Sequence, residues 1–299
     1  MFKLLWVLWV LCLLLNMSFA HAKVIHKERS LYHNILVTDD GDLRCLKFNV
    51  KSAHTQQSCF LKSQPNKLVF NYTKLLMSGL LLNPEPKRIL IIGLGGGTMS
   101  NTLMQLYPQS HIDNVEIDQA VIKVARDYFG FVENNQIKTY QQDGRIFIKR
   151  ALLKKQSYDW IILDAFNGDY IPEHLMTQEF LQEAKALLSE KGILSSNTFS
   201  LSKLYAYESA TYKAVFGNFF QVSSIANSNR IIMVSKNGFT HHNFDSINLN
   251  ALNNKLAPYD VDIKLLHRRM INTKNKQSWS EHTRLLTDQY SPANLLNAN

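Results

Sequence analysis

Cysteine is scarce in this sequence, with three residues among 299, and neither internal repeats nor low-complexity tracts are present. Because nothing near Cys45 or Cys59 supplies further ligands at a useful spacing, no metal site is expected. The absence of repeats excludes a repeat architecture, and 45% hydrophobic residues suffice for a well-filled core. We therefore expect one domain of moderate size with an appendage.

Negative charge is also in short supply. The 24 Asp and Glu residues are outnumbered by 33 Lys and Arg, which leaves a formal net charge of +9. The positive charges are scattered and form no basic stripe interleaved with aromatic residues, so no nucleic-acid partner is expected. An anionic surface or partner stays open. A chain this basic would repel cationic substrates unless its binding pocket is acidic.

The first 22 residues differ from the rest of the chain. Lys3 precedes an apolar run over residues 4–15, and Ala20-His21-Ala22 gives a small-x-small cleavage pattern. This arrangement predicts a secretory signal peptide that is cut after Ala22, and hence an exported or periplasmic protein. The apolar run is short for a membrane span, but an uncleaved leader that anchors the protein in the membrane is the alternative.

Cleavage after Ala22 would leave two cysteines, Cys45 and Cys59. They fall on predicted neighbouring strands at residues 42–50 and 56–62, within a segment that alternates apolar and polar residues. In an oxidising compartment a cross-strand disulfide is expected. Two unpaired buried thiols are the alternative.

An apolar run followed by glycines lies at the centre of the chain. Residues 88–92 read Arg-Ile-Leu-Ile-Ile, which predicts a strand buried on both faces of a parallel sheet. The glycines of the following segment, residues 93–97, let the backbone turn sharply and approach a ligand closely. A predicted helix at residues 98–107 presents its free amide groups there, so we expect a nucleotide-type pocket.

A carboxylate lies at or just after the end of each of the next three predicted strands. The carboxylates are Glu116, Asp143 and Asp164, and the strands span residues 111–117, 136–141 and 158–163. Ligands of open α/β sheets bind beyond the carboxyl ends of the strands, so these groups should face the pocket. Glu116 is placed to bind ribose hydroxyls, Asp143 to accept from the exocyclic amine of a base, and Asp164 to take part in chemistry. As alternatives, Glu116 and Asp143 would cap helices, although Asp118 is better placed than Glu116 for that role.

These motifs resemble those of the spermidine synthase family, the polyamine aminopropyltransferases, over about residues 30–236. The family has a glycine motif similar to GGGDG, a ribose-binding acid within VEID, an adenine loop GDGR and a catalytic loop similar to DSTDPxGPxxxLFTxEFY. The corresponding segments here are GLGGG at 93–97, VEID at 115–118, QDGR at 142–145 and DAFNGDYIPEHLMTQEF at 164–180. The family shares the fold of S-adenosylmethionine-dependent methyltransferases. The resemblance therefore implies an α/β fold with a Rossmann-like, mostly parallel sheet, a reversed terminal strand and a preceding small antiparallel β-hairpin domain.

The resemblance also implies roles for individual residues. Asp164 would accept a proton from an amine substrate, which Tyr72 and Asn167 would contact. The remaining implied site residues would bind the nucleoside, and these are Gly93, Gly95, Gly97, Glu116, Asp143 and Gly144. The co-substrate would be decarboxylated S-adenosylmethionine or S-adenosylmethionine, without a metal. The partners would be this nucleoside and an amine acceptor, and a homodimer stays open.

The expected domain boundaries follow from these segments. They are a signal peptide at 1–22, a β-hairpin domain at 23–65, a Rossmann-type catalytic domain at 66–240 and a polar C-terminal extension at 241–299. An apolar helix is expected over residues 68–82, and an amphipathic helix at 249–256. Residues 285–292 resemble a terminal element of synthase-like relatives, to which no chemistry is assigned.

Three positions depart from the family pattern. Gly96 stands where the family has an Asp that anchors the aminopropyl amine, Asn167 replaces the second Asp of the catalytic loop, and Lys74 replaces an acid that binds the diamine. A buried ammonium without its carboxylate is unfavourable by on the order of several kcal/mol. Three functions therefore stay open: an aminopropyltransferase with altered amine recognition, a methyltransferase on the same scaffold, and a non-catalytic exported nucleoside-binding protein. The lost Asp favours the second and the leader favours the third.

Overall fold

The computed structural model describes residues 22–48, 56–166, 170–225, 227–239, 244 and 247–292. The predicted leader, apart from Ala22, lies outside these ranges, and so does Asn167.

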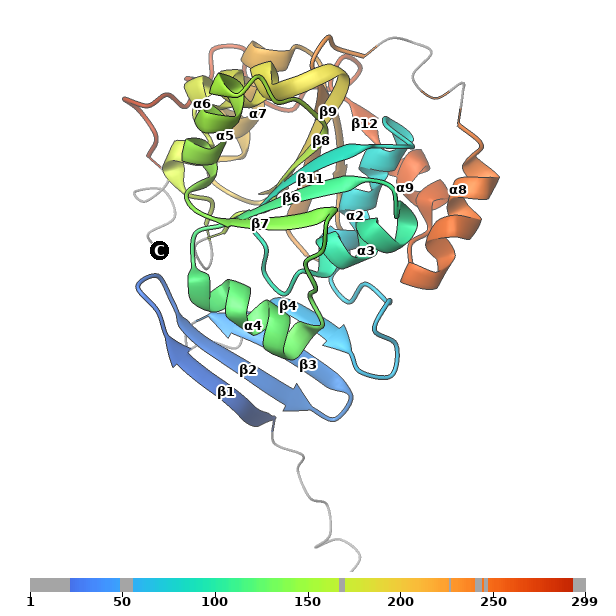
Figure 1. Ribbon diagram of the computed structural model, residues 1–299. Helices are drawn as coiled ribbons and strands as arrows, with labels where there is room; N and C mark the ends of the chain where they lie inside the picture. The colour runs from blue at the N-terminus through green and yellow to red at the C-terminus, as the bar shows by residue number, and fades with distance from the viewer. Residues whose placement is uncertain are drawn as a thin grey trace, which may run out of the picture.

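The described part of the chain begins with a four-stranded antiparallel sheet in the order β1-β2-β3-β4. Its strands are β1 (Lys23–Arg29), β2 (Asn34–Asp40), β3 (Leu43–Phe48) and β4 (Gln56–Leu61). Helix α4 (Gln119–Phe129) lies between this sheet and the larger one (Figure 1). Val121 and Val124 of α4 are buried together with Ile35 and Val37 of β2, so the small sheet is attached through a shared apolar core.

Cys45 and Cys59 occupy opposite positions on β3 and β4, and their sulfur atoms are bonded. Both side chains are buried. The neighbouring Ser58 forms a hydrogen bond of 3.1 Å with the hydroxyl of Thr98, at the start of helix α3 (Thr98–Leu106). The disulfide thus lies next to the strand position that contacts helix α3.

The described residues contain a second sheet of eight strands, in the order β12-β10-β11-β9-β8-β5-β6-β7. Parallel pairing joins β5 (Arg88–Ile92), β6 (His111–Glu116), β7 (Ile137–Gln141), β8 (Tyr158–Leu163) and β9 (Leu188–Phe199). Antiparallel pairing places β11 (Asn229–Ser235) between β9 and β10 (Phe220–Ser223), and joins β12 (Ile271–Asn272) to β10. The predicted fold class is confirmed, with a mostly parallel sheet, a reversed strand near its end and a preceding antiparallel sheet.

Helices cover both faces of the eight-stranded sheet (Figure 1). One face carries α5 (Gly144–Leu153), α6 (Gln178–Leu187) and α7 (Tyr205–Phe216), and the other carries α2 (Asn71–Leu76), α3, α8 (Leu249–Leu256) and α9 (Ile263–Arg269). The strand β5 supplies both cores, because Ile89 and Ile91 pack on the second face and Leu90 and Ile92 on the first. This is why its apolar run is continuous and not alternating.

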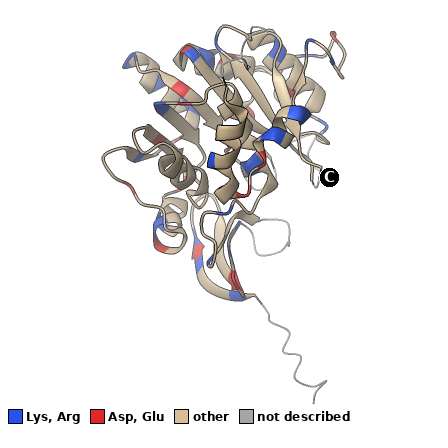
Figure 2. Cartoon of the chain, turned by 90° about the vertical axis from the view of Figure 1, so that its right-hand side faces the viewer, with Lys and Arg blue, Asp and Glu red and all other residues tan. Residues whose placement is uncertain are grey.

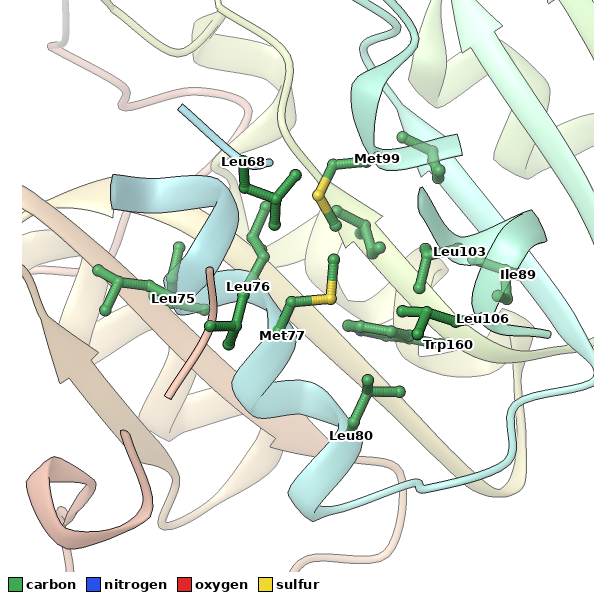
Figure 3. Close-up of a cluster of buried hydrophobic side chains, with 14 of the residues drawn as sticks. Leu68, Leu75, Leu76, Met77, Leu80, Ile89, Met99, Leu103, Leu106 and Trp160 are labelled. Atoms are coloured by element: carbon green, nitrogen blue, oxygen red, sulfur yellow. The ribbon is translucent and has the colours of Figure 1, made fainter. Parts of the chain in front are cut away.

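The predicted helix at residues 68–82 is wrong in its length and regularity. The segment forms α2 and then a tighter helical turn, η1 (Met77–Leu81). Gly79 in η1 lies against the indole of Trp160, where a Cβ atom would come within 2.5 Å of Cζ2. Figure 3 shows Met77 and Leu80 in the same apolar cluster as Trp160. The segment is thus closely packed on the sheet, which the sequence pattern does not report.

Residues 247–272 of the predicted C-terminal extension join the main core. Helix α8 has the predicted bounds, and η3 (Ala257–Tyr259) and α9 follow it. Leu252, Leu256 and Ile263 are buried in the core on the α2 face, and β12 extends the sheet. In the described ranges, no helix has the length and apolar character that crossing a membrane would require.

Candidate functional site

A cavity of about 920 Å³ lies at the carboxyl ends of the central parallel strands. The loops after β5, β6, β7 and β8 form its floor, and residues of β9 and α7 reach it from one side. The small sheet contributes Gln56, Gln57 and Ser58 of β4. Both sheets therefore border the same space.

The glycine loop after β5 forms part of the cavity wall through Gly93 and Gly95. Gly93 has a φ of +97°, and a Cβ atom there would come within 2.4 Å of the carbonyl oxygen of Asp164. Only glycine allows the two loops to approach this closely. Gly97, with a φ of +76°, precedes α3 and packs against Phe131, and it is not among the residues that line the cavity.

Glu116 at the end of β6 faces the cavity and holds the glycine loop in place. Its Oε2 accepts a hydrogen bond from the backbone N–H of Leu94, and its Oε1 accepts one from that of Asp118, both at 3.0 Å. Burial raises the pKa of Glu116, which these hydrogen bonds partly oppose. Helix α4 is capped by Asp118, which accepts from the N–H of Ala120. Because each carboxylate oxygen can accept a further hydrogen bond, Glu116 is free to bind a pair of hydroxyls.

Asp143 caps α5 and lines the cavity at the same time. Its Oδ1 accepts from the N–H of Ile146 at 3.0 Å, and its Oδ2 lies 2.7 Å from Nε2 of His174. Burial acts to raise the pKa of Asp143, but the hydrogen bonds from His174 and Ile146 outweigh it, so the pKa is lowered. Gly144 follows directly, and a Cβ atom there would come within 2.5 Å of Ile92. Both predicted roles of Asp143, cap and cavity group, are thus compatible.

Asp164, after β8, is the most perturbed of the three predicted carboxylates. Burial raises its pKa to about 7, and hydrogen bonds from Asn197 and Tyr72 act against this rise. Nδ2 of Asn197 donates to Oδ1 of Asp164 at 2.9 Å. The phenol of Tyr72, on α2, donates to the same carboxyl, and burial raises the pKa of Tyr72 well above its ordinary value. The structure therefore joins two predicted site residues, Tyr72 and Asp164, at one point of the cavity.

The departures from the family pattern have structural explanations at two positions. At Gly96 a Cβ atom would come within 2.7 Å of Oγ of Ser58 and within 2.9 Å of the ring of Phe129. Lys74 forms an ion pair of 2.5 Å with Asp260 and is not among the cavity-lining residues. An acid at either position would thus meet a packed wall or an acidic neighbour. Asn167 lies outside the described residues, so its position stays a prediction.

Several cavity residues were missed by the sequence interpretation. They are Asn197 on β9, His174 on the turn η2 (Glu173–Leu175) and Glu208 on α7. A signal for Asn197 was present, because Ser195, Ser196 and Thr198 beside it make a polar run within a buried strand. Nothing in the local sequence marks Glu208, which reaches the cavity only through the packing of α7 on the sheet.

The described lining of the cavity is acidic although the chain is basic. It contains four carboxylates and no Lys or Arg, and the carboxylates are Glu116, Asp143, Asp164 and Glu208. Figure 2 shows Lys and Arg distributed over many elements of the outer surface without a continuous stripe. The part of the chain that the structure describes contains no group of three or more His, Cys, Asp or Glu that could hold a metal ion. The cavity wall is therefore suited to a cationic ligand.

Comparison with known sequences gives a consistent family. Residues 69–228 match the spermine/spermidine synthase domain. A polyamine aminopropyltransferase of Vibrio vulnificus is 46% identical over 290 residues, which is 96% of this chain and 96% of that protein.

Comparison with solved structures supports the fold. A probable spermidine synthase from Corynebacterium glutamicum has a TM-score of 0.67 at 21% identity, over 89% of this chain and 97% of its own. A spermidine synthase in complex with the transition-state analogue AdoDATO has a TM-score of 0.64 at 19% identity, over 83% of this chain and 84% of its own. At these sequence identities the structural similarity shows the fold alone.

Proposed function

The chain belongs to the spermine/spermidine synthase family, and on that premise we propose that it transfers an aminopropyl group from decarboxylated S-adenosylmethionine to an amine acceptor. The observation that carries this proposal is the placement of Asp164, which is buried beside Tyr72 and Asn197 in a cavity whose described lining has no Lys or Arg. Both substrates are cations, and this cavity offers them carboxylates.

The nucleoside half of the co-substrate fits the carboxylates at the ends of β6 and β7. The ribose hydroxyls would donate to Glu116, whose oxygens are already oriented by Leu94 and Asp118. The amino group of adenine would donate to Asp143. Because His174 occupies Oδ2 of Asp143 at 2.7 Å, the base would either displace this side chain or share the oxygen with it.

In the chemical step, Asp164 accepts the proton of the attacking amine. The amine nitrogen attacks the propyl carbon next to the sulfonium, the carbon–sulfur bond breaks, and methylthioadenosine leaves with the bonding electron pair. The attacking nitrogen must first be neutral, and a carboxylate whose pKa is about 7 can accept its proton at neutral pH. Before the step, the negative charge of Asp164 also stabilises the sulfonium.

Amine recognition in this protein would differ from the family pattern. The aminopropyl-anchoring acid is replaced by Gly96, which packs on Ser58 and Phe129, and the acid after Tyr72-Thr73 is replaced by Lys74, which pairs with Asp260. The amine groups must therefore rely on other carboxylates of the cavity.

A second candidate function is methyl transfer from S-adenosylmethionine on the same scaffold. The observation that favours it is Gly96, because a site without the amine-anchoring carboxylate suits a cofactor that keeps its own carboxylate. In this case Asp164 would stabilise the sulfonium and contact the methyl acceptor.

We also propose that the protein acts outside the cytoplasm after removal of residues 1–22. The Cys45–Cys59 disulfide supports this location, since structural disulfides persist in oxidising compartments. A non-catalytic nucleoside-binding protein at this location is the remaining alternative.

The test is an analysis of products by mass. The purified protein is incubated with 1,4-diaminobutane and decarboxylated S-adenosylmethionine in one reaction. In a second reaction, S-adenosylmethionine replaces the decarboxylated form. We expect an aminopropyl increment on the amine and an equal amount of methylthioadenosine with the decarboxylated form. A methyl increment with S-adenosylmethionine would favour the second candidate, and no product with either would leave the non-catalytic alternative.

A further inference from the structure

Glu208 on α7 is a cavity-lining carboxylate without a counterpart in the motifs described above. We propose that Glu208 binds the distal ammonium of a diamine acceptor, while Asp164 faces the amine that reacts. This inference rests on the proposed function, because it names the acceptor class of the same site. The acceptor would be a linear aliphatic diamine.

Glu208 is fixed from behind by Arg230. Nη2 of Arg230 lies 3.1 Å from Oε2 of Glu208, and the two side chains are 0% and 3% exposed. Glu208 lines the cavity, whereas Arg230 is not among the lining residues. The carboxylate therefore has the guanidinium on its protein side and the cavity on the other.

Arg230 is itself held by several partners. Its Nε donates to Oγ1 of Thr198 at 2.9 Å and its Nη1 to Oγ of Ser209 at 2.8 Å. The ring of Tyr205 lies 4.1 Å from Cζ. A guanidinium with this many partners fixes the orientation of Glu208. Burial raises the pKa of Glu208 to about 7, and the ion pair with Arg230 opposes this rise. This parallels Asp164, which is oriented by Tyr72 and Asn197.

The space near Glu208 suits the methylene chain of a diamine. Glu208 and Asn197 line the main cavity together with the apolar side chains of Ala165, Leu175 and Met176. Asn197 also donates to Asp164, which lines the same cavity, so Asp164 and Glu208 face one space with these apolar side chains. A cavity that combines apolar side chains with two carboxylates matches a ligand that is apolar in the middle and cationic at its ends.

Electrostatics explains why the second carboxylate is needed. The reacting nitrogen loses its proton, but the distal nitrogen of a diamine stays an ammonium. A buried ammonium without a carboxylate would be strongly disfavoured. The two acids that bind amines in the family pattern are replaced here by Gly96 and Lys74. Of the four described cavity carboxylates, Glu116 and Asp143 lie at the proposed nucleoside end, which leaves Glu208 for this ammonium.

The experiment compares 1,4-diaminobutane with 1-aminobutane, which has the same chain and lacks the second amine. In Glu208→Gln we expect the KM for the diamine to rise at least tenfold, so that it approaches the KM for the monoamine, whose own KM changes less than twofold. Affinity for methylthioadenosine should be unchanged. The control is Glu190→Gln, because Glu190 is an exposed glutamate paired with Lys236 and should leave both KM values unchanged.

Two further measurements keep the inference testable. If Glu208→Gln does not fold because Arg230 is left unpaired, the double variant Glu208→Gln, Arg230→Gln removes both charges and should show the same loss of diamine preference. If the wild-type protein transfers no group to any amine, the proposed function fails, and calorimetric titration of the two amines in the presence of methylthioadenosine tests the subsite alone. Equal weakening of both amines, or an unchanged preference for the diamine, would overturn the assignment of Glu208.

Discussion

The phenol of Tyr72 donates a hydrogen bond to the carboxyl of Asp164 and so joins α2 to the loop after β8. The two residues come from different parts of the chain and meet in the cavity together with Asn197. Burial raises the pKa of Asp164, and the two donors limit this rise, so the pKa is about 7. The carboxyl is therefore able to change its protonation state at neutral pH.

Replacement of Asp164 by Asn should abolish proton transfer without emptying the nucleoside site. We expect kcat to fall by about 100-fold to 10,000-fold, the range for loss of a general base. Affinity for methylthioadenosine, which carries no sulfonium charge, should change less than about threefold. Steady-state kinetics and calorimetry measure the two effects. Asp127→Asn, at an exposed ion pair with Lys123, is the matched control, and equal losses of kcat and nucleoside affinity would make Asp164 a binding residue.

The variant Tyr72→Phe should shift the pH profile of activity. The hydrogen bond from Tyr72 lowers the pKa of Asp164, so its removal raises that pKa. Because the proton acceptor must be ionised, activity is lost as pH falls through this pKa, and the acidic limb of kcat/KM should move to higher pH. Tyr128→Phe is the control, since Tyr128 contacts His26 away from the cavity. An acidic limb that stays in place would show that Tyr72 does not act on Asp164.

Introducing the family's acid at Gly96 should destabilise the protein instead of improving amine binding. The Cβ atom of Gly96→Asp would come within 2.7 Å of Oγ of Ser58 and 2.9 Å of Phe129. Overpacking of this kind costs about 1–3 kcal/mol in free energy of unfolding, which urea denaturation would measure. Adding Ser58→Gly should recover part of the loss by removing one of the two contacts. A variant as stable as the wild type, with a lower KM for the amine, would contradict this explanation.

Loss of the Asp288 carboxylate should loosen the end of the loop that follows Asp164. Asp288 accepts two hydrogen bonds from Arg145 at 2.7 and 2.8 Å, and one from Oγ1 of Thr177 at 2.7 Å. Leu286, beside it, is fully buried against Met176. We expect Asp288→Ala to lower the melting temperature by several degrees and to speed amide exchange around residues 173–177.

The control for this prediction is Asp262→Ala, which removes a carboxylate that caps α9 and should affect exchange there instead. Unchanged exchange at residues 173–177 in Asp288→Ala would mean that the C-terminal segment does not hold this loop. The contacts of Asp288 also give a structural role to residues 285–292, to which the sequence interpretation assigned no chemistry.

The sequence predicted those features that depend on local pattern. The apolar run of β5 predicted a strand buried on both faces. In the structure, the two faces of this strand pack in two separate cores. The motifs placed Glu116, Asp143 and Asp164 at strand ends, and all three line one cavity.

The remaining features depend on contacts between distant segments. Glu208 and Arg230 are partners only because α7 packs over β11. Gly79 of η1 lies against Trp160 of β8, a contact that the local sequence pattern does not reveal. The C-terminal segment is polar in overall composition, so the sequence did not predict that a few of its apolar residues, such as Leu256 and Ile263, are buried in the core. Contacts between distant segments leave no periodic pattern in a single amino-acid sequence.

The central claim is that the carboxylate-lined cavity accepts a cationic sulfonium nucleoside, and direct titration calorimetry tests it most simply. The wild-type protein is titrated at pH 8, where Asp164 is largely ionised, with decarboxylated S-adenosylmethionine and with neutral methylthioadenosine. We predict that both bind and that the sulfonium compound binds at least tenfold more tightly, which is about 1.4 kcal/mol. No detectable binding of either compound at millimolar concentration, or tighter binding of the neutral one, would contradict this account.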